Sequence, residues 1–472
     1  MSDDAHADPH YKWKVLGCVM FGVFMVILDT TVVNVAFPTL RTEFKATLSD
    51  AQWIVSVYVL ALGMSTPLSG YLSDRLGIKR VFLGGLSLFV FGSFLCGLAP
   101  NLGLLIVARA LQGIGGGIAL PLGSAQLYSA FPASEQGRAF GYFGIVLMTA
   151  PALGPLVGGV LVDQGMWRWI FFVNVPIGVS GVWLGVRWLR EFKRNTRPHL
   201  DVAGLLLALV AFGSLLYAAS IAATVGWTAT RTLVWFAVGF VSLIGFVLTD
   251  LHSSKEPLLD FRLFERPTFL TANLIGYVSV IALFGAEFLM PVYLQNLRAR
   301  TSLGSGIILL PLAVTAAIAA PIAGRLYDRI GPRPLVVFGF LVLVVNTWQL
   351  SHLTMVTSIP FVMFLLAMRG LALGTTVQTT FATALGSVPK PRLARGSALI
   401  NATRNVVQSI GVAILATVLA SSGNDPLTGF ENAYRLTFYV SLLAVVIALF
   451  LPGWPGEWSG REGLQSAAAA AA

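Results

Sequence analysis

Long apolar runs alternate along the chain with short polar or basic segments. No charged side chain occurs for 28 residues between Arg80 and Arg109, or for 35 residues between Arg333 and Arg369. An α-helix needs about 18–20 apolar residues to cross the hydrocarbon core of a membrane, and nearly every run approaches or exceeds this length. The pattern therefore predicts fourteen membrane-spanning helices, at residues 13–37, 51–71, 81–99, 103–126, 139–161, 169–188, 202–223, 231–250, 268–294, 303–324, 334–351, 359–386, 396–420 and 433–452.

The composition supports a membrane protein. Of the 472 residues, 56% are hydrophobic and 11% are charged, whereas a soluble domain has about 25% charged residues. These values exclude a cytoplasmic enzyme, a secreted disulfide-rich protein and a disordered chain. The two cysteines, Cys18 and Cys96, lie inside apolar runs, so no disulfide is expected. The five histidines show no metal-ligand spacing, and we expect neither a metal nor a cofactor.

The basic residues gather in the segments between the apolar runs. When alternate segments are assigned to opposite sides of the membrane, 21 of the 31 Lys and Arg residues lie on one side, seven lie on the other, and three lie inside spans. Basic residues favour cytoplasmic loops, so both termini are expected in the cytoplasm. Because topology accounts for the net charge of +10, we expect membrane lipid and no nucleic acid as a partner.

The chain also contains an internal repeat. The segment 70–80 after the second predicted span returns as 324–333 after the tenth, 254 residues later, and Arg109 returns as Arg369 at an offset of 260. Such repeats are typical of transporters in which the substrate site lies between two related bundles, near the middle of the membrane. We expect an all-α polytopic fold of two pseudo-symmetric six-helix bundles plus two inserted spans, divided into an N-terminal tail (1–12), an N-terminal bundle (13–188), a basic linker with the inserted spans (189–250), a C-terminal bundle (251–452) and a C-terminal tail (453–472).

Two of the 21 acidic residues, Asp29 and Glu287, lie well inside predicted spans. Their offset of 258 gives them equivalent positions in the two repeats. A charge in mid-membrane costs at least about 2.5–3.5 kcal/mol, so an intramembrane carboxylate indicates function. Arg109 is predicted at the same depth as Asp29, and the pair could bind and release a proton. The alternative is a static ion pair.

The repeated segment carries glycines and charges that topology alone does not require. A tight turn there needs a glycine that can adopt a positive φ, and an aspartate could pair with a basic residue or cap a helix across the interface between the bundles. We expect this segment to form a conformational latch from Gly70, Asp74, Arg75, Gly77, Arg80, Asp328 and Arg329. The alternative is that its basic residues only set the topology.

The fifth predicted span contains Gly154, Pro155, Gly158 and Gly159. Proline bends a helix, and glycines four residues apart form a face for close helix packing. This group is therefore either a hinge or ordinary tight packing.

Polar and aromatic residues inside the spans are candidates for the lining of a substrate pocket. Each could equally be a contact between helices or with lipid. They are Asn34, Tyr58, Gln126, Met148, Phe284, Tyr293, Asn346 and Gln378.

Five segments occur in an order that resembles a known family. They are Leu28–Pro38, Gly70–Arg80, Arg109–Gly117, Gly154–Gly159 and Trp167–Pro176. Together they resemble the major facilitator superfamily and, within it, the fourteen-span drug/proton antiporters of the EmrB/QacA type. The resemblance covers roughly residues 13–450.

The resemblance implies a monomeric, multi-pass protein of the bacterial inner membrane that exports amphiphilic or cationic small molecules in exchange for protons, by alternating access. Antibiotic resistance is the physiological role it suggests. Asp29 stands at the family's first-helix acidic position and Arg109 at its fourth-helix arginine, while Glu287 matches less closely. Two intramembrane acids are few for a substrate with two positive charges.

Other functions remain open at this point. The same fold could export one dedicated metabolite, lipid or peptide. A membrane-embedded enzyme would need a nucleophile, a metal or paired acids at one depth, and two acids at repeat-equivalent positions suit coupling better. A non-transporting receptor usually has a sizeable extramembrane domain, whereas no predicted loop exceeds about twenty residues.

Overall fold

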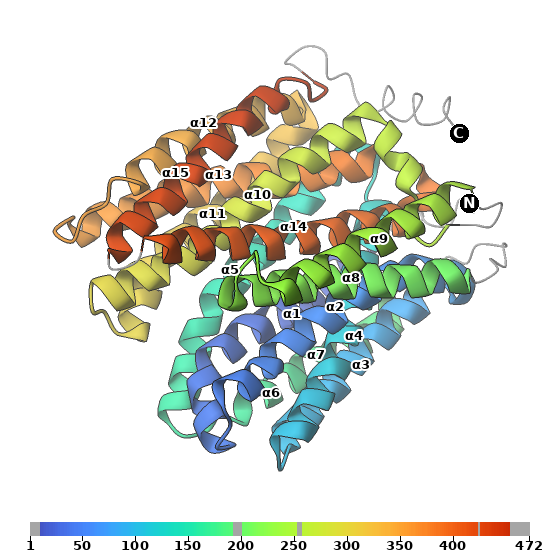
Figure 1. Ribbon diagram of the computed structural model, residues 1–472. Helices are drawn as coiled ribbons and strands as arrows, with labels where there is room; N and C mark the ends of the chain where they lie inside the picture. Colours follow the sequence, from blue (N-terminus) through green and yellow to red (C-terminus); the bar gives the residue numbers. More distant parts are fainter. Residues whose placement is uncertain (1–9, 192–200, 253–256, 423–424, 454–472) are drawn as a thin grey trace.

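The apolar runs fold into long α-helices that lie side by side in two groups, as Figure 1 shows for the computed structural model. The structure describes residues 10–191, 201–252, 257–422 and 425–453. The first group is formed by α1 (Tyr11–Glu43), α2 (Leu48–Leu76), α3 (Ile78–Leu98), α4 (Leu102–Ala130), α5 (Gln136–Asp163), α6 (Trp169–Phe172) and α7 (Asn174–Trp188).

The second group follows an inserted pair of helices, α8 (Val202–Val225) and α9 (Thr230–His252). It is formed by α10 (Pro267–Pro291), the short helix η4 (Val292–Leu297), α11 (Ser302–Ile330), α12 (Pro332–Leu350), α13 (Ile359–Gly386), α14 (Leu393–Ser421) and α15 (Pro426–Ala448). Three short 3₁₀ turns, Ala133–Glu135, Phe261–Glu265 and Lys390–Arg392, precede helices or connect them. We call α1–α7 the first half and α10–α15 the second half.

Thirteen helices of the described chain are long and apolar enough to cross a membrane. The remaining predicted span, 268–294, falls on α10, where the described apolar stretch is the shorter Pro267–Ala282. The side chains of residues 283–288 are outside the described part. The predicted span 169–188 is divided at Val173 into α6 and α7.

The inserted helices lie along the junction of the two halves (Figure 1). Helix α8 packs against α2 of the first half and α14 of the second, while α9 packs mainly on α8. The indole N–H of Trp227, in the turn between α8 and α9, donates to the Thr417 hydroxyl of α14 at 2.6 Å. The insertion therefore covers one side of the junction between the halves.

Matching helix ends repeat in the two halves. Thr47 caps α2 by accepting from the Asp50 backbone N–H, and Thr301 caps α11 by accepting from that of Gly304. These caps are 254 residues apart, the offset found for the repeated segment.

The repeated segment is more helical than predicted, because α2 continues to Leu76 and α11 to Ile330. The chain turns at a single glycine in each half, Gly77 with φ +97° and Gly331 with φ +81°. A side chain rarely adopts these angles, so both turns depend on glycine.

Candidate functional site

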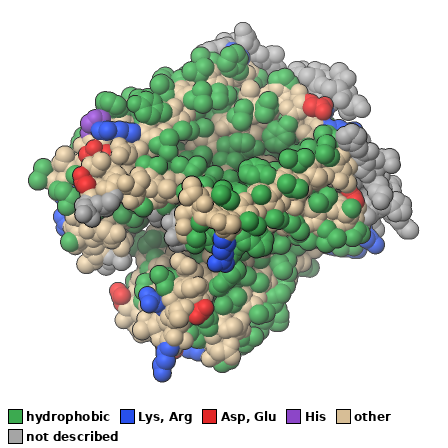
Figure 2. Space-filling view, in the orientation of Figure 1, with side chains coloured by type: hydrophobic (Ala, Val, Ile, Leu, Met, Phe, Trp, Pro, Cys, Tyr) green, Lys and Arg blue, Asp and Glu red, His purple; other side chains and the backbone are tan. Residues whose placement is uncertain are grey.

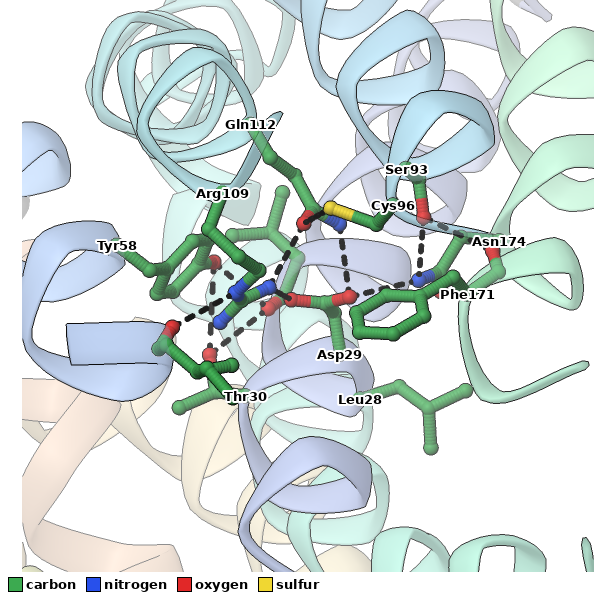
Figure 3. Close-up of polar contacts among 12 residues, drawn as sticks. Leu28, Asp29, Thr30, Tyr58, Ser93, Cys96, Arg109, Gln112, Phe171 and Asn174 are labelled. Atoms are coloured by element: carbon green, nitrogen blue, oxygen red, sulfur yellow. Dashed lines mark hydrogen bonds and ion pairs between the residues drawn. The ribbon is translucent and has the colours of Figure 1, made fainter. Parts of the chain in front are cut away.

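Asp29 of α1 lies at the centre of a buried polar cluster in the first half (Figure 3). Arg109 of α4 donates to one carboxylate oxygen at 2.5 Å. The side-chain amides of Gln112 on α4 and Asn174 on α7 donate to the other oxygen at 2.7 and 2.9 Å. All four side chains are at most 1% exposed. Three donors around two oxygens suit an ionised carboxylate, which accepts and cannot donate.

The guanidinium of Arg109 is held from several directions. Its Nε donates to the Ile54 carbonyl at 3.1 Å, and its Nη1 also donates to the Gln112 carbonyl oxygen at 2.7 Å. The Tyr58 ring lies 4.0 Å from the guanidinium carbon, in cation–π geometry. The arginine therefore links α1, α2 and α4, and a change in its position would alter contacts with all three helices.

Asn174 connects the cluster to α3 and α6. Its Nδ2 donates to the Ser93 hydroxyl at 3.1 Å, and that hydroxyl donates to the Phe171 carbonyl at 2.8 Å. The division between α6 and α7 places Asn174 at the start of α7, where its side chain reaches Asp29.

Asp29 and Arg109, predicted at one depth, are thus brought together, whereas Gln112, Asn174 and Ser93 were not predicted. Gln112 follows Arg109 by three residues, a spacing that places both on one face of a helix. Asn174 is an amide within an otherwise apolar run. Those two signals were available in the sequence, although neither indicates the partner.

The equivalent arginine of the second half has different partners. Arg369 of α13 is fully buried and donates to the Asn346 side-chain carbonyl at 3.3 Å and to the Ala282 backbone carbonyl at 2.6 Å. Among the residues that the structure describes, no carboxylate lies within ion-pair distance of it. Glu287, predicted as the counterpart of Asp29, is on α10 with its side chain outside the described residues.

A second polar group joins the two halves at the end of the molecule where α1 begins and α15 ends, which we call the proximal end. Asp74, near the end of α2, forms an ion pair of 2.7 Å with Arg395 of α14, and both side chains are buried. Gly70 lies one turn earlier, where an added Cβ would be 3.1 Å from the Arg395 Cα. The helix backbones thus approach closely at this point, and a larger residue at position 70 would have to push Arg395 away by a few tenths of an ångström.

Asp328 of α11 makes the corresponding contact in the other direction. Its two carboxylate oxygens accept from the backbone N–H groups of Gly137 and Arg138, at 2.8 and 2.9 Å. These groups lie in the first turn of α5, where a negative charge also interacts favourably with the helix dipole. The repeat therefore carries an ion pair on one side and a helix cap on the other.

Among the described residues, the arginines of the predicted latch form no hydrogen bond or ion pair with the opposite half. Arg75 is exposed and donates to Tyr71 of its own helix, and Arg80 is exposed beside Glu191. Arg329 is also exposed. The aspartates, rather than these arginines, form the contacts between the halves.

Two glycines of α5, Gly154 and Gly158, pack against α1. An added Cβ on Gly154 would be 2.0 Å from the Thr31 hydroxyl oxygen, and one on Gly158 would be 3.2 Å from the Val32 carbonyl oxygen. Gly159 has open space at the same position, and α5 continues as one helix through Pro155. These contacts favour close packing within one half over a hinge.

Four of the eight predicted pocket residues form hydrogen bonds inside the halves. Tyr58 bonds to the Val26 carbonyl beneath Arg109, and Tyr293 bonds to the Thr354 carbonyl. Gln126 donates to the Ile78 carbonyl, and Asn346 both donates to Leu365 and accepts from Arg369. These four side chains are not free for a ligand in this conformation.

The other candidates differ in position. Asn34 is exposed, Met148 is buried, and the side chain of Phe284 is outside the described residues. Gln378 lines a cavity of about 10 Å³ between α5, α11 and α13, which is close to the size of one water molecule. On the surface, Figure 2 shows a hollow between the halves at the end opposite the proximal contacts.

Comparison with known proteins gives a family match. Residues 19–412 and 274–457 match the Major Facilitator Superfamily. A Bacillus subtilis protein named an uncharacterized MFS-type transporter, YhcA, is 35% identical over 91% of this chain and 78% of its own length. The match is to a family of transporters and not of enzymes, as predicted, and the predicted resemblance to the superfamily is confirmed.

Two further relatives have names that refer to drug resistance. The lincomycin resistance protein LmrB of Bacillus subtilis is 28% identical over 95% of this chain and 97% of its own length. The multidrug resistance protein B homolog of Mycobacterium tuberculosis (strain H37Rv) is 33% identical over 86% of this chain and 76% of its own length.

Solved structures show the same fold at low sequence identity. The proton:xylose symporter XylE, bound to 6-bromo-6-deoxy-D-glucose, superposes with a TM-score of 0.69 at 15% identity, covering 97% of this chain and 99% of its own. The human organic anion transporter MFSD10 superposes with a TM-score of 0.67 at 15% identity, covering 93% of this chain and all of its own.

Proposed function

Because the chain belongs to the Major Facilitator Superfamily, we propose that it exports amphiphilic or cationic drugs in exchange for protons, by alternating access between the two halves. The observation that carries the proposal is the fully buried Asp29 carboxylate with Arg109 at 2.5 Å. The names of its relatives, which refer to resistance to lincomycin and to multiple drugs, support the substrate class.

The proposed arrangement in the membrane has fourteen spans, with α10 as the ninth. The proximal end faces the cytoplasm, as the distribution of basic residues favours. The protein works as a monomer in the inner membrane of a bacterium. In the described conformation the Asp74 and Asp328 contacts hold the cytoplasmic end closed, and the hollow at the opposite end faces outward.

Proton uptake at Asp29 is the proposed coupling step. A neutral carboxyl group balances neither the charge of Arg109 nor the two amide donors, so Arg109, Gln112 and Asn174 change position when the proton arrives. Because these residues lie on α4 and α7, the change alters how α1 packs in the first half. The halves then part at the proximal end, where the proton leaves and substrate enters.

The test measures proton release from purified protein when a drug binds, for the native sequence and for Asp29→Asn. Native protein is expected to release protons on adding a lipophilic cation such as tetraphenylphosphonium, and Asp29→Asn is expected to release none. Asp29→Glu serves as the matched control because it keeps a titratable group. Proton release by folded Asp29→Asn equal to that of the native protein overturns the proposal.

A further inference from the structure

A buried arginine on the second half, Arg404 of α14, lies close to the junction of the two halves. Seven residues earlier on α14, the Ser397 hydroxyl donates to the Pro121 carbonyl of α4 in the first half at 2.8 Å. A spacing of seven residues is about two helical turns, so Arg404 lies on the same face of α14, about 10 Å farther from the proximal contacts. This face is turned toward the first half.

A second contact places Arg404 at the same junction. Its guanidinium carbon is 4.9 Å from the centre of the Phe381 ring of α13. The Phe381 ring in turn contacts the first half, since its centre lies 5.6 Å from that of the Phe140 ring of α5. Arg404 is thus one aromatic residue away from the opposite half.

The guanidinium of Arg404 is poorly satisfied for its burial. It is 8% exposed, and among the described residues its Nη2 donates only to the Thr380 hydroxyl, at 3.4 Å, while its Nε has no hydrogen-bond partner. Within the described ranges, no carboxylate lies within ion-pair distance. Arg109, by comparison, has a carboxylate, an amide, a carbonyl and an aromatic ring.

An arginine with five N–H donors and one long bond to a neutral hydroxyl is costly inside a membrane protein. The Phe381 ring offsets only part of that cost, since a cation–π contact contributes about 0.5–2 kcal/mol. A planar guanidinium binds carboxylates and phosphates through paired hydrogen bonds. The missing partner is therefore best supplied by an acidic group that is not part of the described chain.

We propose that Arg404 binds an acidic group of the transported molecule, so that the substrates include amphiphiles carrying a carboxylate or a comparable anion. Phe381 beside the guanidinium contacts the apolar part of the same molecule. The inference rests on the proposed export function and narrows its substrate class. Asp29 does not compete with such a group for Arg404, because the Asp29 carboxylate is already paired with Arg109.

The test uses two fluorescent molecules that differ only in their polar end, 1-pyrenebutyrate and 1-pyrenebutanol, bound to the purified full-length chain at fixed pH. The native chain is expected to bind the carboxylate at least about tenfold more tightly than the alcohol, as for a charge-assisted hydrogen bond. In Arg404→Gln the ratio should fall to about one. Arg404→Lys should retain part of the preference, because it keeps the charge and loses the paired geometry.

A second variant moves the guanidinium without removing it. An added Cβ on Gly276 of α10 would be 2.3 Å from the Nη2 of Arg404, so Gly276→Ala should also lower the ratio. Gly159→Ala, with nothing within 4 Å of the added Cβ, is the matched control and should leave it unchanged. A native ratio in folded Arg404→Gln overturns the proposal, and so does an equal affinity of the native chain for both molecules.

Glu287 provides the competing explanation, since its side chain is outside the described residues. If it neutralised Arg404, the native ratio would be near one and would rise in Glu287→Gln, and that result overturns the proposal. A high ratio in both proteins supports it. Asp29→Asn should keep the ratio while losing proton release, so failure of proton coupling and failure of the anion site give different results.

Discussion

The two halves place an arginine at equivalent points of the repeat, but they surround it differently. Arg109 faces the carboxylate of Asp29 and the amide of Gln112, whereas the described partners of Arg369 are neutral carbonyl oxygens. Duplication has thus kept the position of the guanidinium and not its chemistry. The first half holds a buried pair of opposite charges, whereas the described hydrogen-bond partners of Arg369 leave its positive charge without a carboxylate.

The largest effect is expected for Arg109→Met. Removing one member of a buried ion pair leaves the Asp29 carboxylate unbalanced, which costs about 3–5 kcal/mol. The free energy of unfolding, measured by titrating detergent-solubilised protein with dodecyl sulfate, should fall by that amount. The double variant Asp29→Asn with Arg109→Met should recover part of the loss, and a double variant as unstable as Arg109→Met alone would contradict the ion-pair explanation.

The two proximal contacts should differ in strength. Asp74→Asn leaves the Arg395 charge without its carboxylate at a cost of about 2–5 kcal/mol, whereas Asp328→Asn weakens a helix cap worth about 0.5–2 kcal/mol. The measurement is the distance between spin labels on the exposed positions 75 and 329, which are on opposite halves. Asp74→Asn should shift more molecules to the longer distance, and equal shifts would show that the two contacts are equivalent.

Arg369→Met should destabilise the chain less than Arg109→Met, by about 1–3 kcal/mol. The variant leaves the Asn346 and Ala282 oxygens without their donor, and an unsatisfied buried acceptor costs that much. The same dodecyl sulfate titration gives the value. A loss of unfolding free energy as large as that of Arg109→Met would reveal a carboxylate partner of Arg369 in the second half. The two arginines would then not differ in their surroundings.

The last expected effect, of similar size to that of Arg369→Met, concerns the packing of α5 on α1. Gly154→Ala should cost about 1–3 kcal/mol, because the added Cβ meets the Thr31 side chain and backbone. Gly159→Ala is the control on the same helix and should be neutral or stabilising by up to about 1 kcal/mol. If both variants retain native stability, the glycine face is not required for packing.

The sequence by itself determined the class of the protein, the repeat and the chemistry of the first half. The length of each apolar run predicts a membrane-spanning helix, because a backbone with unpaired polar groups cannot cross hydrocarbon. The cost of a charge inside the membrane identified Asp29 and Arg109 as candidate functional residues. Both features are local properties of the chain. The internal repeat also indicated the aspartates of the repeated segment, although that segment was expected to be less helical than it is.

Only the tertiary structure decided which polar groups meet. Asn174 lies 145 positions from Asp29, and Arg395 lies 321 positions from Asp74, and no spacing rule predicts such contacts. It also separated the arginines, since Arg109 has a carboxylate and Arg404 has no described one. The sequence identifies a charged side chain but not its partners. The role of that side chain depends on which donors and acceptors the packed helices bring within about 3 Å of it.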